Sequence, residues 1–199
     1  MGSMVNRVAR SWVDAVRTLV AKLPRDVDAV ALEHFREQAS ELAWRDDRPT
    51  LDTITDTPLR YRRVLVSDPD CHNFSALLIA WPPGHRTALH DHDGLWGAEL
   101  VLDGALAVDE YQNHPQGNVP HPTFQRTMML GIGDATVFAD PSYIHSCRNL
   151  SDERGALTLH VYGGPLENYL SYQPDNQGTY RPWPTQARLD DVWSTDDQS

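Results

Sequence analysis

The stretch HDHDGLWGAELVLDGALAV, residues 90–108, combines a closely spaced pair of histidines with a tight turn between two apolar runs. Side chains alternate between the two faces of a strand, so His90 and His92 point the same way. Two imidazoles on one face form half of a metal site. The pair Asp103-Gly104 lies between ELVL and ALAV, a strong local signal for a β-hairpin. The stretch therefore predicts antiparallel β-structure that carries metal ligands.

The same period of two continues on both sides of this stretch. From residue 60, short strand-like runs are separated by turn residues; the runs are YRRVLV, NFSALLIAW, TALHDH, AELVLDGALAVDEY, FQRTMML, ATVFAD, HSCRN and ALTLHVYG. No helical pattern separates them, and about eight short strands at this spacing are typical of an antiparallel sandwich or barrel. We therefore predict an all-β jelly-roll barrel over residues 60–166.

Two amphipathic helices are predicted ahead of the barrel. In the first, Ser11 can cap the N-terminus and Pro24 ends the helix. The second covers residues 26–44, where we interpret His34 as a partly buried helix residue and not as a ligand. The apolar stripes consist of Trp12, Val13, Val16, Leu19, Val20 and Leu23 in the first helix, and of Val27, Val30, Ala31, Phe35, Ala39 and Leu42 in the second. We expect both stripes to pack onto the barrel.

The remaining segments lack a regular pattern. Residues 45–59 are polar and contain prolines, which is typical of a connector. After Gly164 the chain is expected to be loop-like, and its acidic end is expected to fray. The predicted organisation is one domain made of N-terminal helices with a connector (1–59), the barrel (60–166) and a C-terminal extension with an acidic tail (167–199).

The composition restricts the partners and the compartment. Lysine plus arginine (17) minus aspartate plus glutamate (28) gives a net charge of −11, which argues against nucleic acid and anionic membranes as partners. No apolar run is long enough to span a bilayer. Cys71 and Cys147 are too few for a disulfide framework in 199 residues, so we expect a reducing cytoplasm. The oligomeric state stays open between a monomer and a small homo-oligomer.

A third imidazole, at His145, decides how the histidine pair is interpreted, since a bare pair could also be two surface residues near a turn. Residues 84–104, GHRTALHDHDGLWGAELVLDG, resemble the first motif of the cupin superfamily, except that Gly97 stands where many cupins have a glutamate ligand. Residues 133–149, GDATVFADPSYIHSCRN, resemble the second cupin motif. The resemblance implies a metal ion held by His90, His92 and His145.

Three neutral histidines without a carboxylate leave coordination positions open for a thiolate and for dioxygen. Within the cupins, this pattern resembles the thiol dioxygenases, that is, the cysteine dioxygenase family and its bacterial relatives, over residues 61–165. The resemblance implies Fe(II) as the cofactor, although imidazole also suits other divalent metals. In animal members, a cysteine at the position of Gly97 is joined covalently to a tyrosine. Glycine excludes that crosslink here, as in the bacterial relatives.

The stretch ALTLHVYG, residues 156–163, carries the resemblance further. It is similar to the Ser-x-His-x-Tyr strand of the family, with a threonine in place of the serine. Alternation places its three polar side chains on one face, where the resemblance implies a catalytic hydrogen-bonded relay of Thr158, His160 and Tyr162. The alternative is that these side chains only fill the barrel.

The stretch LRYRRVLV, residues 59–66, resembles the strand whose Tyr-x-Arg supplies a substrate-binding arginine in cysteine dioxygenases. Tyr61 and Arg63 share a face, and a guanidinium matches both oxygens of a carboxylate. Relatives that prefer 3-mercaptopropionate use an arginine just after the relay strand, where this chain has GGPLENYL. Carboxylate binding is therefore assigned to Arg63, with surface arginines at a strand start as the alternative.

Two side chains near the predicted ligands have no assigned role. If its strand is regular, Glu99 enters the barrel, where it could bind a substrate ammonium, pair with an arginine or replace the missing ligand; a bulge would turn it outward. Cys147 shares the face of His145 and is expected to pack among apolar groups. The histidines of the turn-rich segments are expected to be exposed, namely His72, His85, His114 and His121.

The leading hypothesis is an Fe(II)-dependent thiol dioxygenase. It would use O2 to convert a small carboxylate-bearing thiol to the sulfinate, with cysteine favoured and 3-mercaptopropionate next. Two alternatives remain: a metal-dependent cupin enzyme acting on another small acid or thiol, and a metal-binding cupin sensor without turnover. Oxygen uptake after addition of thiols would separate the three.

Overall fold

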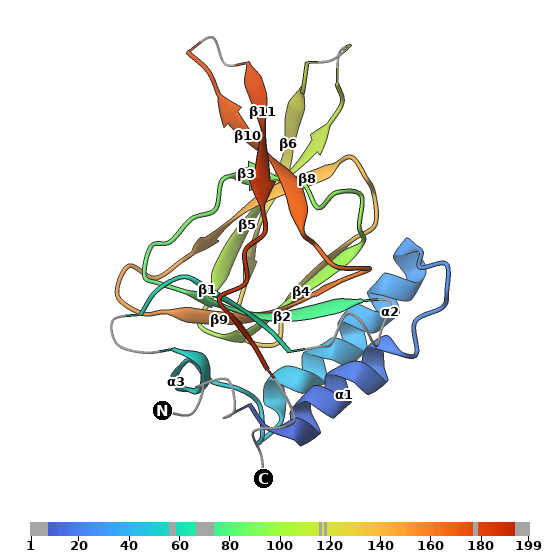
Figure 1. The fold of residues 1–199 in the computed structure, drawn as a ribbon, viewed down its shortest axis with the longest axis vertical. Helices are drawn as coiled ribbons and strands as arrows, with labels where there is room; N and C mark the ends of the chain where they lie inside the picture. The colour runs from blue at the N-terminus through green and yellow to red at the C-terminus, as the bar shows by residue number, and fades with distance from the viewer. Residues whose placement is uncertain are drawn as a thin grey trace.

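The computed structural model describes residues 8–55, 59–66, 74–115, 117, 119–176 and 179–193. In these residues a short helical segment is followed by β-strands (Figure 1). The helices are α1 (Arg10–Val20), α2 (Ala29–Ala39), the 3₁₀ helix η2 (Ser40–Trp44) and α3 (Leu51–Ile54). The predicted all-β fold with two N-terminal amphipathic helices is confirmed. Among the described residues, no helix combines the length and the apolar character needed to cross a membrane.

Within the described residues, the strands form two six-stranded sheets. The first sheet has the order β12 (Asp191–Val192), β1 (Arg62–Leu65), β2 (Ser75–Trp81), β9 (Ala156–Tyr162), β4 (Gly97–Asp103) and β7 (Ala135–Phe138). The second sheet has the order β11 (Tyr180–Gln186), β10 (Asn168–Pro174), β3 (Leu89–His90), β8 (Tyr143–Asn149), β5 (Leu106–Asn113) and β6 (Pro122–Leu130). Strand β12 pairs with β1 in parallel, and the other neighbours in the first sheet pair antiparallel.

The central strands of the first sheet are buried on both faces, which explains why their sequences are almost continuously apolar. In β2, Ala76, Leu78 and Ala80 join the core under the helices, whereas Leu77, Ile79 and Trp81 face the second sheet. Strand β9 alternates in the same way, with Leu157, Leu159 and Val161 in the core under the helices. The intervening residues of β9 therefore point between the two sheets.

The turn at Asp103-Gly104 forms as predicted, but the predicted hairpin is wrong. Strand β4 belongs to the first sheet and β5 to the second, so the turn is a corner between the sheets. Gly104 has a φ of 75°, and a Cβ there would lie 2.8 Å from the Cβ of Ala156. Local sequence marks the reversal of the chain, but which strand pairs with which depends on long-range packing.

The helices differ from the expectation in two details. Ser11 lies inside α1, whose N-cap is Ala9, and its hydroxyl donates to Asp47 at 2.6 Å. In α2 the buried face includes Leu32 and Phe35, whereas Val30 is 64% exposed. His34 is exposed. Asp28 accepts a hydrogen bond from Ala31 N and is the N-cap, so the helix begins at Ala29 and not at residue 26.

The expectation of a loop-like chain after Gly164 is also wrong. Strands β10 and β11 pair over seven positions, and Figure 1 shows this hairpin projecting away from the helices. Pro182 and Pro184 occupy alternate positions of β11, the edge strand, where their missing N–H groups need no partner. The acidic end, residues 194–199, lies outside the described residues.

Residues 187–193, here called the C-terminal strap, lead from the second sheet to the first. Ala187 N donates to Glu167 O, Asp190 N donates to Arg63 O, and Trp193 N donates to Leu65 O. Trp193 is buried, and its indole N–H donates to Val8 O at 3.2 Å. The strap therefore passes beside β1 and is held at both ends.

Candidate metal centre

The three predicted metal ligands come together between the sheets. His90 ends β3, His145 is its register partner on β8, and His92 follows in the turn after β3. One nitrogen from each ring lies within 4.8 Å of those of the other two. His92 and His145 are buried, and His90 borders the cavity. The spacing of the three imidazoles suits one metal ion.

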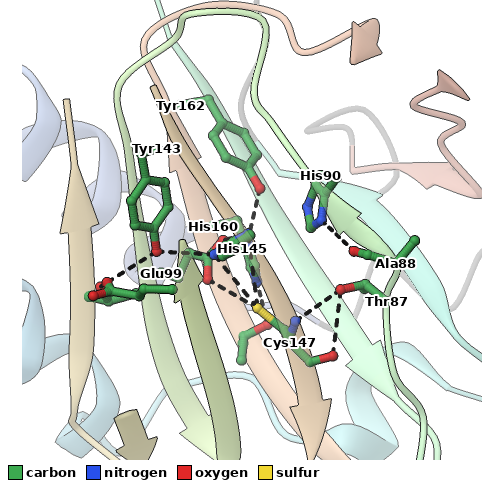
Figure 2. Close-up of polar contacts among 12 residues, drawn as sticks. Thr87, Ala88, His90, Glu99, Tyr143, His145, Cys147, His160 and Tyr162 are labelled. Carbon is green, nitrogen blue, oxygen red and sulfur yellow. Dashed lines mark hydrogen bonds and ion pairs between the residues drawn. The ribbon is translucent and has the colours of Figure 1, made fainter. Parts of the chain in front are cut away.

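The hydrogen bonds of these rings also suit a metal ion. His90 Nδ1 lies 2.9 Å from the carbonyl oxygen of Ala88, which can only accept, so Nδ1 is the donor and Nε2 is free (Figure 2). Both ring nitrogens of His92 are buried without a hydrogen-bond partner among the described residues. Such an orphaned buried group is costly unless a ligand satisfies it. The residues present therefore fit a metal ion.

Burial keeps the three imidazoles neutral, which is the form that binds metal. Burial lowers the pKa of His90 and lowers that of His92 well below its ordinary value. It lowers the pKa of His145 to about 3. At neutral pH the cluster therefore presents lone pairs and no ammonium-like charge.

A second layer of side chains orients His145, and sequence reasoning missed it. The phenol of Tyr143 donates to Glu110 Oε1 at 3.2 Å. Its oxygen also lies 3.2 Å from His145 Nδ1 (Figure 2). Because the phenol proton is used on the carboxylate, its oxygen accepts from Nδ1–H and leaves Nε2 for a metal. Glu110 also pairs with Arg126. Only the register of β5 against β8, which sets Glu110 opposite His145, reveals this arrangement.

The position of Gly97 is filled by an aromatic ring and is not an open space. A Cβ at Gly97 would lie 2.2 Å from Cζ of Phe138. That ring stacks on Tyr143 with centroids 4.5 Å apart, and its centroid lies 4.3 Å from that of His92. Neither a glutamate ligand nor a crosslinking cysteine fits at residue 97 unless Phe138 moves.

The relay residues of β9 line up inside the barrel. His160 Nε2 lies 2.8 Å from Thr158 Oγ1, and His160 Nδ1 lies 3.0 Å from the phenol oxygen of Tyr162. Trp81 extends the chain, since its indole N–H donates to Thr158 Oγ1 at 2.9 Å. All three relay residues are buried, and the end of the relay at His160 and Tyr162 borders the cavity that His90 and His145 line.

Glu99 faces inward, which removes the alternative of an outward-turning bulge. Its Oε1 lies 3.1 Å from His160 Nδ1 and 3.4 Å from His145 Nε2, and Cys147 donates to its Oε2 at 3.6 Å. Burial opposes ionisation, but His145 and His160 lower the pKa of Glu99 below its ordinary value. Burial raises the pKa of Cys147 well above its ordinary value, so this side chain stays a thiol.

The two residues predicted to bind a carboxylate lie at the same cavity, which measures about 300 Å³. Arg63 is only 9% exposed, and the described residues give its guanidinium no hydrogen bond or ion pair, since its contact with Asp190 is made by the backbone. Tyr61 lies beside it, while Arg62 points away and contacts Ile54 and Asp191. The alternative of two surface arginines therefore does not describe Arg63.

Other residues at the cavity were not predicted. Arg188 and Asp190 of the C-terminal strap, together with Tyr169, line its mouth. No sequence signal marks Arg188, because it lies in the segment expected to be loop-like. His85 is half-buried and stacks on Tyr61 with centroids 4.4 Å apart, so the expectation that it is exposed is wrong. His114 and His121 are exposed as predicted, and His72 lies outside the described residues.

Comparisons with known proteins give one family match and several similar solved structures. Residues 1–174 match the sequence model of the family described as cysteine dioxygenase type I. Among solved structures, TT1209 from Thermus thermophilus is 22% identical, with 57% of this chain and 93% of that chain covered and a TM-score of 0.42. A cupin superfamily protein from Desulfitobacterium hafniense DCB-2 is 14% identical, with 59% and 91% covered and a TM-score of 0.42. Oxalate decarboxylase from Lactobacillus farciminis is 20% identical, with 59% and 32% covered and a TM-score of 0.43.

The family match includes the N-terminal helices, the three histidines and the relay strand, and ends before the C-terminal strap. It confirms the resemblance that the two histidine motifs indicated. The chain belongs to the cysteine dioxygenase type I family.

Proposed function

We propose that this protein is an Fe(II)-dependent thiol dioxygenase that converts a small carboxylate-bearing thiol to its sulfinate with O2. The observation that carries the proposal is the convergence of three groups on one cavity: the three-imidazole cluster, the end of the relay at Tyr162, and the buried guanidinium of Arg63. A substrate that spans the cavity would contact all three.

Arg63 binds the carboxylate in this proposal. Its guanidinium is buried and has no anionic partner among the described residues, so an incoming carboxylate would satisfy it. A bidentate pair of this kind in a partly desolvated site contributes about 2 kcal/mol. The backbone of Arg63 is itself held, since its N–H donates to Asp190 Oδ2 at 2.8 Å and its carbonyl accepts from Asp190 N.

His90, His92 and His145 would hold the metal ion. When bound, ferrous iron supplies a Lewis acid that favours the thiolate form of the substrate and a redox-active centre for dioxygen. The protein holds the substrate by its carboxylate, so that the sulfur is confined near the imidazoles. Tyr162 can donate a hydrogen bond to charge that develops on oxygen.

Glu99 supports an amino-thiol acid such as cysteine over 3-mercaptopropionate. Glu99 is one of the cavity-lining residues, and its buried Oε1 has no hydrogen-bond partner among the described residues, so the carboxylate can receive a substrate ammonium. Ile79 and Leu166 add apolar surface to a cavity that also has Arg63 and Glu99 in its lining, which favours a short substrate with charged groups.

The state of Cys147 supports a proposal about the cellular compartment. Cys147 is a free, buried thiol beside Glu99, and such a group persists where thiols are kept reduced. We therefore place the protein in the cytoplasm, as a monomer or small homo-oligomer with a thiol and O2 as its partners.

The test is a panel of thiols given to the iron-loaded protein while oxygen uptake and sulfinate formation are measured. The panel contains cysteine, 3-mercaptopropionate, mercaptosuccinate and cysteamine, and the variants are Arg63→Ala and Arg62→Ala. We expect turnover of cysteine, and a loss of about 30-fold in kcat/KM for the acids in Arg63→Ala, equivalent to about 2 kcal/mol. Arg62→Ala is the matched control, because Arg62 points away from the cavity.

His145→Ala controls for the metal. This variant should lose most of its bound iron with little change in the far-UV circular dichroism. Its oxygen uptake should be lost together with the iron. Full iron occupancy in this variant would discard the three-histidine site. Rapid oxidation of cysteamine by wild type would overturn the carboxylate clamp, since cysteamine has no carboxylate. Iron binding without oxygen uptake for any thiol would favour a metal-binding sensor.

A further inference from the structure

Glu99 and Tyr162 meet at the same atom, Nδ1 of His160. The phenol oxygen lies 3.0 Å from this nitrogen and Glu99 Oε1 lies 3.1 Å from it. Figure 2 shows Glu99 beside His145, His160 and Cys147. The relay expected from the sequence has three members, so this carboxylate is an addition to it.

The carboxylate determines where the proton of His160 lies. A lone pair on Nδ1 would face a buried negative charge at 3.1 Å, which is strongly unfavourable at low dielectric. Nδ1 therefore carries the hydrogen, whether the ring is neutral or protonated. The negative charge of Glu99 is supported from its other side, where Cys147 donates to Oε2.

The opposite end of the ring is consistent with this tautomer. Thr158 Oγ1 accepts from the indole of Trp81, so its own proton is free to be donated. The partners in reach are His160 Nε2 at 2.8 Å and the carbonyl of Ile79 at 3.5 Å. The shorter contact favours donation to Nε2, which then needs no hydrogen of its own.

The position of the hydrogen on Nδ1 decides what Tyr162 can do. Glu99 Oε1 accepts no aligned hydrogen bond among the described residues, so the N–H is directed at the phenol oxygen. The oxygen of Tyr162 is then an acceptor towards His160, and its O–H remains for another partner. Tyr162 borders the cavity, so its O–H can be directed at a group bound there.

We propose that Glu99 is a positioning residue that holds the hydrogen of His160 on Nδ1 and thereby makes Tyr162 a hydrogen-bond donor into the cavity. Without this carboxylate, His160 can take the other tautomer, in which Nδ1 accepts the phenol proton and the donor is lost. The proposal rests on the proposed thiol dioxygenase activity for its kinetic consequence, but the tautomer itself can be measured independently.

The first experiment measures the tautomer by ¹⁵N NMR of histidine-labelled, zinc-loaded protein, because zinc is diamagnetic. Wild type should show His160 protonated at Nδ1. Glu99→Gln should keep this form, because the partial negative charge of an amide oxygen also disfavours a lone pair on Nδ1, whereas Glu99→Leu should shift the hydrogen to Nε2. Glu99→Met, which has a similar length, serves if the leucine variant does not fold. An unchanged tautomer in both apolar variants would overturn the proposal, even if no thiol is turned over.

The second experiment measures kcat and KM of the iron-loaded protein with cysteine and with 3-mercaptopropionate. Glu99→Leu should lower kcat about 10- to 100-fold for both substrates, the same loss that we expect of Tyr162→Phe, and the double variant should be no slower than Tyr162→Phe. Glu99→Gln should lower kcat less than Glu99→Leu does. A loss confined to cysteine would overturn the proposal in favour of ammonium binding. A fall in iron affinity in both the leucine and glutamine variants would overturn it in favour of a metal ligand.

Discussion

At the scale of single residues, Gly97 is required by its neighbour and not by its own backbone conformation. In relatives this position can carry a ligand or a crosslink, but here Phe138 fills the space between Gly97 and His92. The ring is fixed because it is stacked on Tyr143. The Phe138 ring therefore occupies the space that a carboxylate side chain at residue 97 would need.

Gly97→Ala tests this packing. The new Cβ would lie 2.2 Å from the Phe138 ring, so the variant should lose about 1–3 kcal/mol in free energy of unfolding and bind iron more weakly through displacement of His92. Urea unfolding and a chelator competition measure the two effects. Gly131→Ala is the control, because its Cβ meets nothing closer than 3.7 Å.

Phe138→Leu should restore part of both losses when combined with Gly97→Ala, since the smaller side chain leaves room for the methyl group. Equal stability of Gly97→Ala and Gly131→Ala would show that the ring moves freely and that Gly97 has no such role.

At the scale of elements, the C-terminal strap contributes both to the core of the protein and to the lining of the cavity. Trp193 packs in the core under the helices, and Arg17 lies over its ring at 5.6 Å. The same strap brings Arg188 and Asp190 to the cavity mouth. Trp193 therefore anchors a segment whose side chains line the cavity in which we propose that the substrate binds.

Trp193→Ala should lower the free energy of unfolding by about 3 kcal/mol, as expected for a buried tryptophan. It should also raise KM for the acid substrates more than it lowers kcat, because the relay and the metal ligands do not lie on the strap. Leu189→Ala removes a strap side chain that is 45% exposed. This variant should change neither the free energy of unfolding nor KM. An unchanged KM in Trp193→Ala would separate the strap from substrate binding.

At the scale of the whole molecule, the stability of the metal-free protein should depend on pH through the three buried imidazoles. Burial lowers their pKa in the folded state, to about 3 for His145, whereas the unfolded value is about 6.5. Between these values the unfolded chain binds protons that the folded protein does not. The contribution of these imidazoles to the free energy of unfolding therefore rises with pH up to about 6.5. It decreases as the pH falls towards 3.

Thermal unfolding of the metal-free protein between pH 7 and pH 5 measures this effect, since most carboxyl groups titrate below that window. His92→Gln removes one buried imidazole, and its melting temperature should fall less steeply with decreasing pH. His114→Gln, which changes an exposed histidine, should keep the wild-type slope. The same slope in His92→Gln and wild type would contradict the assignment.

The sequence by itself determined the features that depend on neighbouring residues. Alternation along a strand brought Thr158, His160 and Tyr162 to one face, and two short motifs supplied the three histidines that the structure brings together. The same alternation separated Arg63 from Arg62. These predictions succeeded because the geometry of a strand repeats every two residues, whatever the rest of the chain does.

Only the tertiary structure decided what lies opposite each of these faces. It placed Phe138 against Gly97, Glu110 opposite His145, Glu99 between two imidazoles, and Arg188 at the cavity mouth. It also turned the predicted hairpin at Asp103-Gly104 into a corner between sheets. These contacts join residues that are distant in sequence, and they depend on strand register and sheet packing, which no local pattern of residues contains.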